Sequence, residues 1–143
     1  MSQADSPADS DTPPRPRFFV DRSLGRIEFP RLLRARGVDL ITLAEHYGIP
    51  SDESVEDVTW LADTARLGWV VLAKDARLRQ RPAERAAIHE HEARCFYFAR
   101  ADLPAAETAA RFVRNRAAIE RACSDPGPFA YAIHAKRILR MSL

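Results

Sequence analysis

Residues 57–79 read DVTWLADTARLGWVVLAKDARLR, and this stretch decides the fold class. Its first half carries apolar residues at helical spacing, namely Val58, Leu61, Ala62 and Ala65. Gly68 ends the predicted helix, and the next five residues, Trp69–Ala73, are all apolar. A wholly apolar strand is typical of the centre of a parallel sheet that is covered on both faces. The stretch therefore predicts a helix that leads into a buried parallel strand.

The same alternation continues on both sides of this stretch. Further strands are predicted at residues 17–20, 38–43, 95–98 and 129–133, the last of them at an edge of the sheet. Helices are predicted at residues 29–36, 55–67, 82–92 and 104–122, with a loop at residues 47–54. Strands and helices that alternate at this spacing indicate an α/β fold, with a four- or five-stranded, mainly parallel sheet and helices on both faces.

The chain divides into three parts. Its 143 residues suit one compact domain. Residues 1–16 consist largely of Ser, Asp, Ala and Pro, so we expect a disordered tail there. Residues 17–134 form the domain, and residues 135–143 are a C-terminal extension that is either a short helix or a loose tail.

The folded part of the chain is basic, although the net charge of the whole chain is only +2. All 22 basic residues and 17 of the 20 acidic residues lie in residues 15–143, and 20 of the bases are Arg. Arg favours bidentate contacts with phosphate or carboxylate, but a nucleotide bias in the genome would enrich it as well. The longest apolar runs have five residues, whereas a membrane span needs about 20, and the first 17 residues hold no secretory signal. We therefore expect a cytoplasmic protein without membrane contact.

Two aspartates follow predicted strands and a third opens a predicted helix. Asp21 comes after FFV and Asp75 after WVVLAK, so both should lie at the carboxyl edge of the sheet, where α/β proteins bind ligands. Asp57 begins a helix, and that helix start reaches either the same edge or the opposite one. If the three carboxylates meet at about 5 Å, each pair repels by roughly 3 kcal/mol, and a divalent cation such as Mg²⁺ would neutralise them. Such a site can hydrolyse phosphodiesters. In the alternative interpretation, each aspartate is a turn former or a helix cap.

Three blocks of the chain, FFVDRSLGR at residues 18–26, the stretch at 57–79, and PGPFAYAI at 126–133, resemble one known family. They are similar to the PIN-like nuclease superfamily, and in particular to the VapC-type toxins of bacterial toxin–antitoxin pairs. The resemblance covers roughly residues 17–134. It implies a three-layer PIN-like fold, an acidic pocket that binds Mg²⁺ or Mn²⁺, and endoribonuclease activity.

The resemblance also implies which residues form the site. Asp21, Asp57 and Asp75 match the family's metal-binding and catalytic acids by position. Many PIN domains carry a further acid, usually Glu, on a helix between the first two. Glu45 is the nearest candidate here, beside an apparent strand rather than on a helix, and Asp52 and Glu56 are other substitutes.

Residues next to the acids are candidates for binding the RNA backbone. Arg22 flanks Asp21 and Arg77 follows Asp75, and bases beside such a site can hold phosphates on either side of the scissile bond. Ser23 stands where these proteins often carry a hydroxyl near the first acid, and we group it with the expected phosphate contacts. The alternative is that the arginines are solvated or paired with the acids.

These observations leave more than one function open. The first is a metal-dependent endoribonuclease that acts as a toxin, whose substrate is RNA and whose partner is a small antitoxin protein; a homodimer is possible. The second is a PIN-like protein that has lost activity and only binds RNA or a partner. The third is a receiver-type phosphoacceptor domain, but such domains carry paired acids after the first strand, whereas Arg22 follows Asp21 here.

Overall fold

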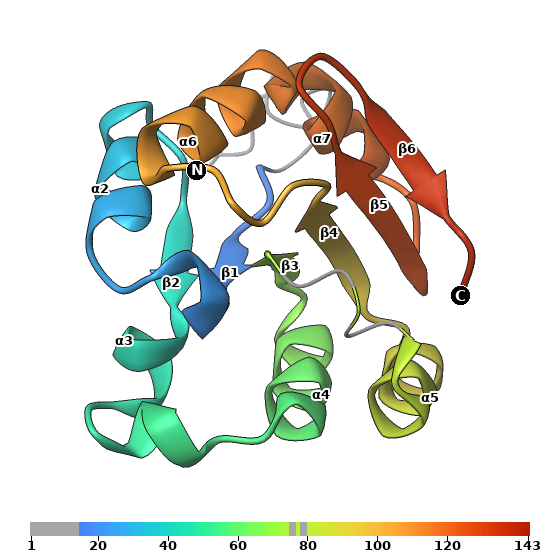
Figure 1. The fold of residues 1–143 in the computed structure, drawn as a ribbon. Helices are drawn as coiled ribbons and strands as arrows, with labels where there is room; N and C mark the ends of the chain where they lie inside the picture. Colours follow the sequence, from blue (N-terminus) through green and yellow to red (C-terminus); the bar gives the residue numbers. More distant parts are fainter. Residues whose placement is uncertain (1–14, 75–76, 78–79) are drawn as a thin grey trace, which may run out of the picture.

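The computed structural model describes residues 15–74, 77 and 80–143, so Asp75 and most of the predicted tail lie outside the described residues. It shows a single sheet with strand order β2-β1-β3-β4-β5-β6 between two layers of helices (Figure 1). The predicted α/β class, the mainly parallel sheet and the helices on both faces are confirmed. The sheet has six strands rather than the four or five predicted.

The first five strands run parallel to one another. They are β1 (Phe18–Val20), β2 (Leu40–Thr42), β3 (Val70–Ala73), β4 (Arg94–Phe98) and β5 (Phe129–Ile133). Although β1 has only three residues, it pairs with β2 on one side and with β3 on the other, so that Phe19 lies opposite both Ile41 and Val71. The short first strand therefore lies inside the sheet, and its pairing on both sides fixes the backbone position of the next residue, Asp21.

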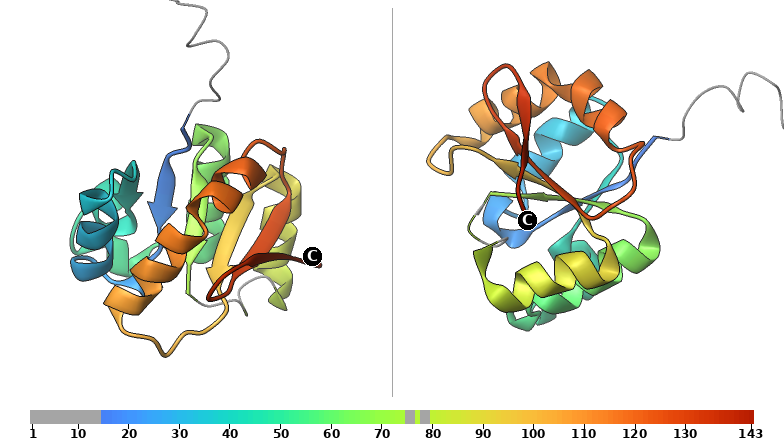
Figure 2. Two further views of the ribbon diagram at one scale, coloured as in Figure 1. Left: turned by 90° about the horizontal axis from the view of Figure 1, so that it is seen from above. Right: turned by 90° about the vertical axis from the view of Figure 1, so that its right-hand side faces the viewer.

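The helices cover the two faces of the sheet separately. Their bounds are α2 Glu28–Ala35, α3 Leu43–Tyr47, α4 Asp57–Leu67, α5 Pro82–His91, α6 Ala105–Arg114 and α7 Arg116–Ala122, with short 3₁₀ helices η1 (Arg22–Leu24) and η2 (Ser51–Ser54). Figure 2 shows α4 and α5 on one face and α2, α6 and α7 on the other.

Strand periodicity explains the two cores between these layers. In β1, Phe18 and Val20 face α2 and α6, whereas Phe19 faces the opposite core that Trp60 and Leu61 of α4 fill. All three β1 residues are at most 1% exposed. Side chains that alternate between two apolar cores produce the continuous apolar runs seen in the sequence.

The predicted helix at residues 104–122 is two helices. Asn115 separates α6 from α7, is 4% exposed, and donates from Nδ2 to the carbonyl oxygens of Arg111 and His134. The side-chain amide adds to the backbone bonding at the break and ties it to the turn after β5. The apolar pattern continues through the break, so it did not reveal the boundary.

The C-terminal residues contain a strand, so the prediction of a short helix or a loose tail is wrong. β6 (Ile138–Met141) pairs antiparallel with β5, and β6 rather than β5 forms the edge of the sheet. Arg140 of β6 lies over the rings of Phe129 and Tyr131, with its guanidinium 5.9 and 5.7 Å from the two centroids. In the part of the chain that the structure describes, no helix combines the length and apolar character needed to cross a membrane.

Candidate active site

Asp21 is a buried carboxylate at the carboxyl end of the central strand β1. It is 7% exposed, and its backbone N–H donates to the carbonyl of Leu72 at the end of β3. Its Oδ2 accepts a 2.8 Å hydrogen bond from the Ser23 hydroxyl and a longer one, 3.4 Å, from the Ser23 backbone N–H. Its Oδ1 is buried and has no hydrogen-bond partner among the described residues. An oxygen of this kind is ready to accept a ligand.

Burial raises the pKa of Asp21 above its ordinary value, and the nearby charge of Asp57 raises it further. The hydrogen bonds from Ser23 and from the backbone work in the opposite direction but are outweighed. The surroundings of Asp21 therefore disfavour its ionised form.

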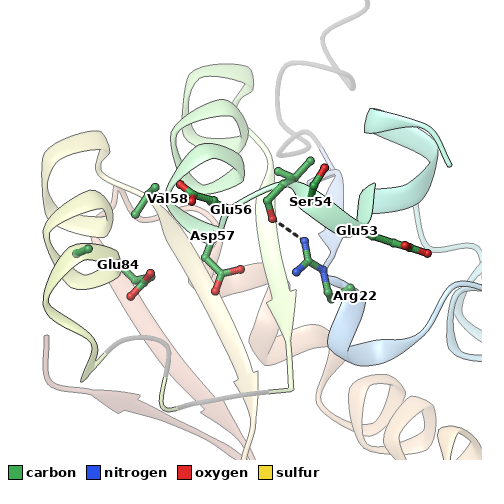
Figure 3. Close-up of a pocket in the computed structure, with 9 residues that line it drawn as sticks. Arg22, Glu53, Ser54, Glu56, Asp57, Val58 and Glu84 are labelled. Atoms are coloured by element: carbon green, nitrogen blue, oxygen red, sulfur yellow. Dashed lines mark hydrogen bonds between the residues drawn. The ribbon is translucent and has the colours of Figure 1, made fainter. Parts of the chain in front are cut away.

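Asp57 is the first residue of α4, and its carboxylate is fixed by two neighbours. Oδ1 accepts a 2.9 Å hydrogen bond from the indole Nε1–H of Trp60, a fully buried residue one turn along the helix. Oδ2 lies 3.6 Å from Nη1 of Arg81. The N-cap position belongs to Glu56, so Asp57 does not act as the helix N-cap. Asp57 lines the same pocket as Arg22, the residue after Asp21, so the start of α4 reaches the same edge of the sheet as the end of β1 (Figure 3).

A pocket of about 450 Å³ lies beside Asp57. It is lined by Arg22, by residues 53–58, and by Ala83 and Glu84 at the start of α5. Figure 3 shows the Asp57 carboxylate and the Arg22 guanidinium pointing into the same space, with Glu84 on the neighbouring helix. The pocket thus combines several carboxylates with one guanidinium.

Residues 16–100 match the family model described as a PIN like domain. The chain belongs to the PIN-like domain family. A protein of Mycobacterium tuberculosis (strain ATCC 25618 / H37Rv) named "Putative ribonuclease VapC45" is 46% identical over 124 residues, which cover 87% of this chain and 90% of that protein. The resemblance to VapC-type proteins is thereby confirmed. No solved structure gives a significant match to the chain.

In this PIN-like domain, Ser23 joins the first acid to the chain segment that carries the third. The Ser23 hydroxyl donates to Asp21 and accepts a 2.9 Å hydrogen bond from the backbone N–H of Lys74. Asp75 itself lies outside the described residues, but its neighbour Lys74 is thus held beside Asp21. The distances from Asp75 to Asp21 and Asp57 stay predictions.

Glu45 lies on a helix, so the interpretation that placed it beside a strand is wrong. Thr42 accepts from the Glu45 N–H through its side chain, and Glu45 accepts from the Thr42 N–H, which together form a capping box at the start of α3. Arg34 of α2 also donates to both carboxylate oxygens of Glu45, at 3.0 and 2.7 Å, and the pair lowers the pKa of Glu45. Glu45 is therefore engaged with α2 and its own helix start.

The other candidates for a further acid have different surroundings. Asp52 is buried and accepts three hydrogen bonds from Arg26. Glu56 lines the pocket beside Asp57. Within residues 15–74, 77 and 80–143, no group of three His, Cys, Asp or Glu side chains is close enough to hold a metal ion. A complete triad therefore requires Asp75.

The three expected phosphate contacts lie in different places. Arg22 follows Asp21, and its Nη2 donates to the carbonyls of Asp52 and Val55, at 3.0 and 2.6 Å. Ser23 bonds Asp21 and Lys74 as described above. Arg77 is exposed. Contact of these three residues with RNA stays a prediction.

Two functional neighbours were missed at the sequence level. Trp60 is a buried core residue whose indole N–H also orients the Asp57 carboxylate. The spacing DxxW at a helix start is a signal that could have indicated this bond, because residues three apart lie on the same face of a helix. The Arg26–Asp52 pair spans 26 residues and has no local sequence signal.

Proposed function

We propose that this chain is a metal-dependent endoribonuclease that hydrolyses RNA phosphodiester bonds and acts as the toxin of a toxin–antitoxin pair. The observation that carries the proposal is the buried Oδ1 of Asp21, which has no hydrogen-bond partner among the described residues, next to Arg22, which lines one pocket with Asp57. The printed name of the relative, a ribonuclease, supports the proposed activity.

The donor set suits a hard divalent cation. Mg²⁺ and Mn²⁺ prefer carboxylate oxygens, and Asp21, Asp57 and Asp75 would hold the ion. When bound, such an ion activates a water molecule and stabilises the leaving oxygen of a phosphodiester. Burial and the charge of Asp57 raise the pKa of Asp21, and a cation bound at Asp21 would offset both effects.

The chain's own side chains orient these ligands. The hydroxyl of Ser23 engages Oδ2 of Asp21 and leaves Oδ1 without a hydrogen-bond partner among the described residues. The indole of Trp60 engages one oxygen of Asp57 and sets the rotation of that carboxylate. Arg77 and Ser23 are proposed to contact the RNA phosphates, with a small antitoxin protein as the partner that blocks the site.

The test is cleavage of an end-labelled single-stranded RNA with Mg²⁺ or Mn²⁺, with EDTA as the metal-free control. Single changes of Asp21, Asp57 and Asp75 to Asn should each lower the cleavage rate on the order of 10³-fold, which corresponds to about 4 kcal/mol of transition-state stabilisation. Asp102→Asn is the matched control, since this aspartate is 72% exposed and pairs with Arg100 on the surface. Cleavage that survives EDTA, or that survives both Asp21→Asn and Asp75→Asn, would refute the metal-nuclease proposal. Absence of cleavage by the unmodified chain with either metal would favour an inactive binding protein.

A further inference from the structure

The segment that leads into Asp57 is attached to the segment that follows Asp21 by two arginines. Residues 51–56 contain η2 and precede α4, and they lie outside the sheet. Arg22 and Arg26 belong to η1 and the turn after it, within five residues of Asp21. Each acid is thus separated from these contacts by only a few residues of chain.

Arg22 forms the first attachment. One nitrogen, Nη2, donates to the backbone carbonyls of Asp52 and Val55, at 3.0 and 2.6 Å. These carbonyls lie at the start of η2 and two residues before Asp57. Figure 3 shows the guanidinium directed at this backbone, between η1 and the start of α4.

Arg26 forms the second and stronger attachment. Its Nε and Nη2 donate to both carboxylate oxygens of Asp52, at 2.8–3.0 Å, and Nη2 also lies 3.4 Å from Glu53. The Asp52 side chain is 4% exposed, whereas that of Arg26 is 39% exposed. A bidentate contact to a buried carboxylate fixes both partners geometrically, and removing the cation leaves a buried charge without its partner.

We infer that Arg22 and Arg26 are positioning residues that keep Asp57 next to Asp21. We call Arg22, Arg26 and their acceptors in residues 52–55 the arginine clamp. The inference rests on the proposed function, since it concerns the same acids, and it assigns Arg22 a role different from a phosphate contact. Replacing a residue that orients a metal ligand without touching the metal typically lowers metal affinity by about 10- to 100-fold.

The position of Asp57 can be observed without metal. The chain has two tryptophans, so its ¹⁵N–¹H spectrum shows two indole N–H signals, and the Trp60 indole donates to Asp57. In the metal-free Arg26→Ala protein, the Trp60 signal should move or broaden beyond its linewidth, while that of Trp69 stays in place. Arg31→Ala is the matched control, because the Arg31–Glu28 pair is exposed and lies on α2. It should leave both signals unchanged.

Metal binding gives the second measurement, made with Mn²⁺ alone by electron paramagnetic resonance. Arg26→Ala should weaken Mn²⁺ binding by about tenfold. Arg26→Lys keeps the charge but cannot form the bidentate contact, so it should give an intermediate affinity and remains testable if Arg26→Ala does not fold. Arg31→Ala should bind Mn²⁺ like the unmodified chain.

Cleavage kinetics separate positioning from RNA contact. A positioning role lowers kcat and leaves the KM for RNA nearly unchanged. A phosphate contact raises KM and reduces the slope of log affinity against log salt by about 1 per contact. A KM effect with a reduced salt slope in Arg22→Lys or Arg26→Lys, together with an unchanged Trp60 signal, would overturn the clamp.

The clamp and the proposed function can fail separately. If the unmodified chain bound no Mn²⁺, the metal proposal would fail, and the Trp60 signal in the metal-free variants would still decide the clamp. If Mn²⁺ bound but the Trp60 signal of both Arg26 variants matched the unmodified chain, the clamp would be refuted and the metal site would stand.

Discussion

Replacing Asp21 by Asn is expected to raise the stability of the metal-free protein and to remove its response to Mg²⁺. Asn has the same size and keeps an oxygen that can accept the Ser23 hydroxyl, but it carries no charge. In the folded chain the carboxyl of Asp21 is buried beside Asp57, and its pKa lies above the ordinary value of 3.8. Asn relieves this desolvation and repulsion, so the variant should be more stable without metal. With Mg²⁺ it should be the less stable protein, because it lacks the charge that binds the ion.

The size of the effect follows from linkage. Each unit by which folding raises the pKa of a carboxyl lowers the free energy of unfolding by about 1.4 kcal/mol at a pH above both values. The bond from Ser23 weakens when its acceptor loses its charge, which offsets about 1 kcal/mol. Burial is the largest cause acting on the pKa of Asp21, so we expect the net effect at pH 7 to be a gain in unfolding free energy and a higher Tm.

The pH dependence has a defined sign. Because folded Asp21 holds its proton more tightly than unfolded Asp21, the stability of the unmodified chain falls as pH rises through the folded pKa. The advantage of Asp21→Asn should therefore be absent in acid, below the ordinary value of 3.8, and complete at neutral pH.

Mg²⁺ should reverse the order of the two proteins. At a concentration 100-fold above its Kd, a ligand that binds only the folded state adds about 2.7 kcal/mol. The unmodified chain gains this and Asp21→Asn does not, so the unmodified chain becomes the more stable of the two. The measurement is thermal unfolding of both proteins, each with EDTA and with Mg²⁺. Repeating it at an acidic and a neutral pH tests the pH dependence as well. A metal-free variant less stable than the unmodified chain at pH 7, together with no Mg²⁺ response in either protein, would refute the reasoning.

Three further predictions concern other parts of the molecule. Glu45→Gln should lower the unfolding free energy by at most about 1 kcal/mol, because its pair with Arg34 is half exposed, and should leave RNA cleavage unchanged; a large loss of cleavage would place Glu45 in the site. Asn115→Ala should lower the free energy of unfolding by about 1 kcal/mol in denaturant unfolding, because the buried Asn115 side chain loses two hydrogen bonds, one of them the tie to the His134 carbonyl. Induction of the chain alone in bacteria should arrest growth, and co-expression of its genomic partner should restore it; normal growth despite verified expression would count against a toxin.

The long elements could be predicted from the sequence because burial on both faces produces continuous apolar runs and a helical stripe. Short elements could not be predicted in this way. α3 has five residues and follows β2 without a gap, so its apolar residues merge with those of the strand. The capping-box spacing of Thr42 and Glu45 was the signal that could have separated the two. β6 was missed because only half of its residues are partly buried, which leaves no apolar alternation to detect.

The candidate site was predictable only in part for a similar reason. Asp21 could be placed at the sheet edge because the position of a residue after a buried strand is set by the strand itself. The side chains that orient the acids could not be inferred, since the Arg26–Asp52 contact joins residues 26 apart through tertiary packing. Sequence position suggested that Arg22 faces RNA, whereas its observed acceptors are backbone carbonyls of its own chain.

The rigidity of β1 explains how the fold can hold an unfavourable charge at Asp21. A carboxylate on a flexible loop would turn toward water and so avoid the desolvation cost of burial. Asp21 cannot do so, because its backbone N–H is bonded to Leu72 and Phe18–Val20 are locked between two strands and two apolar cores. The desolvation of the carboxylate therefore persists in the metal-free protein, and in the proposed enzyme its relief adds to the affinity for the cation. The buried strand next to the acid thus contributes to metal binding without touching the metal.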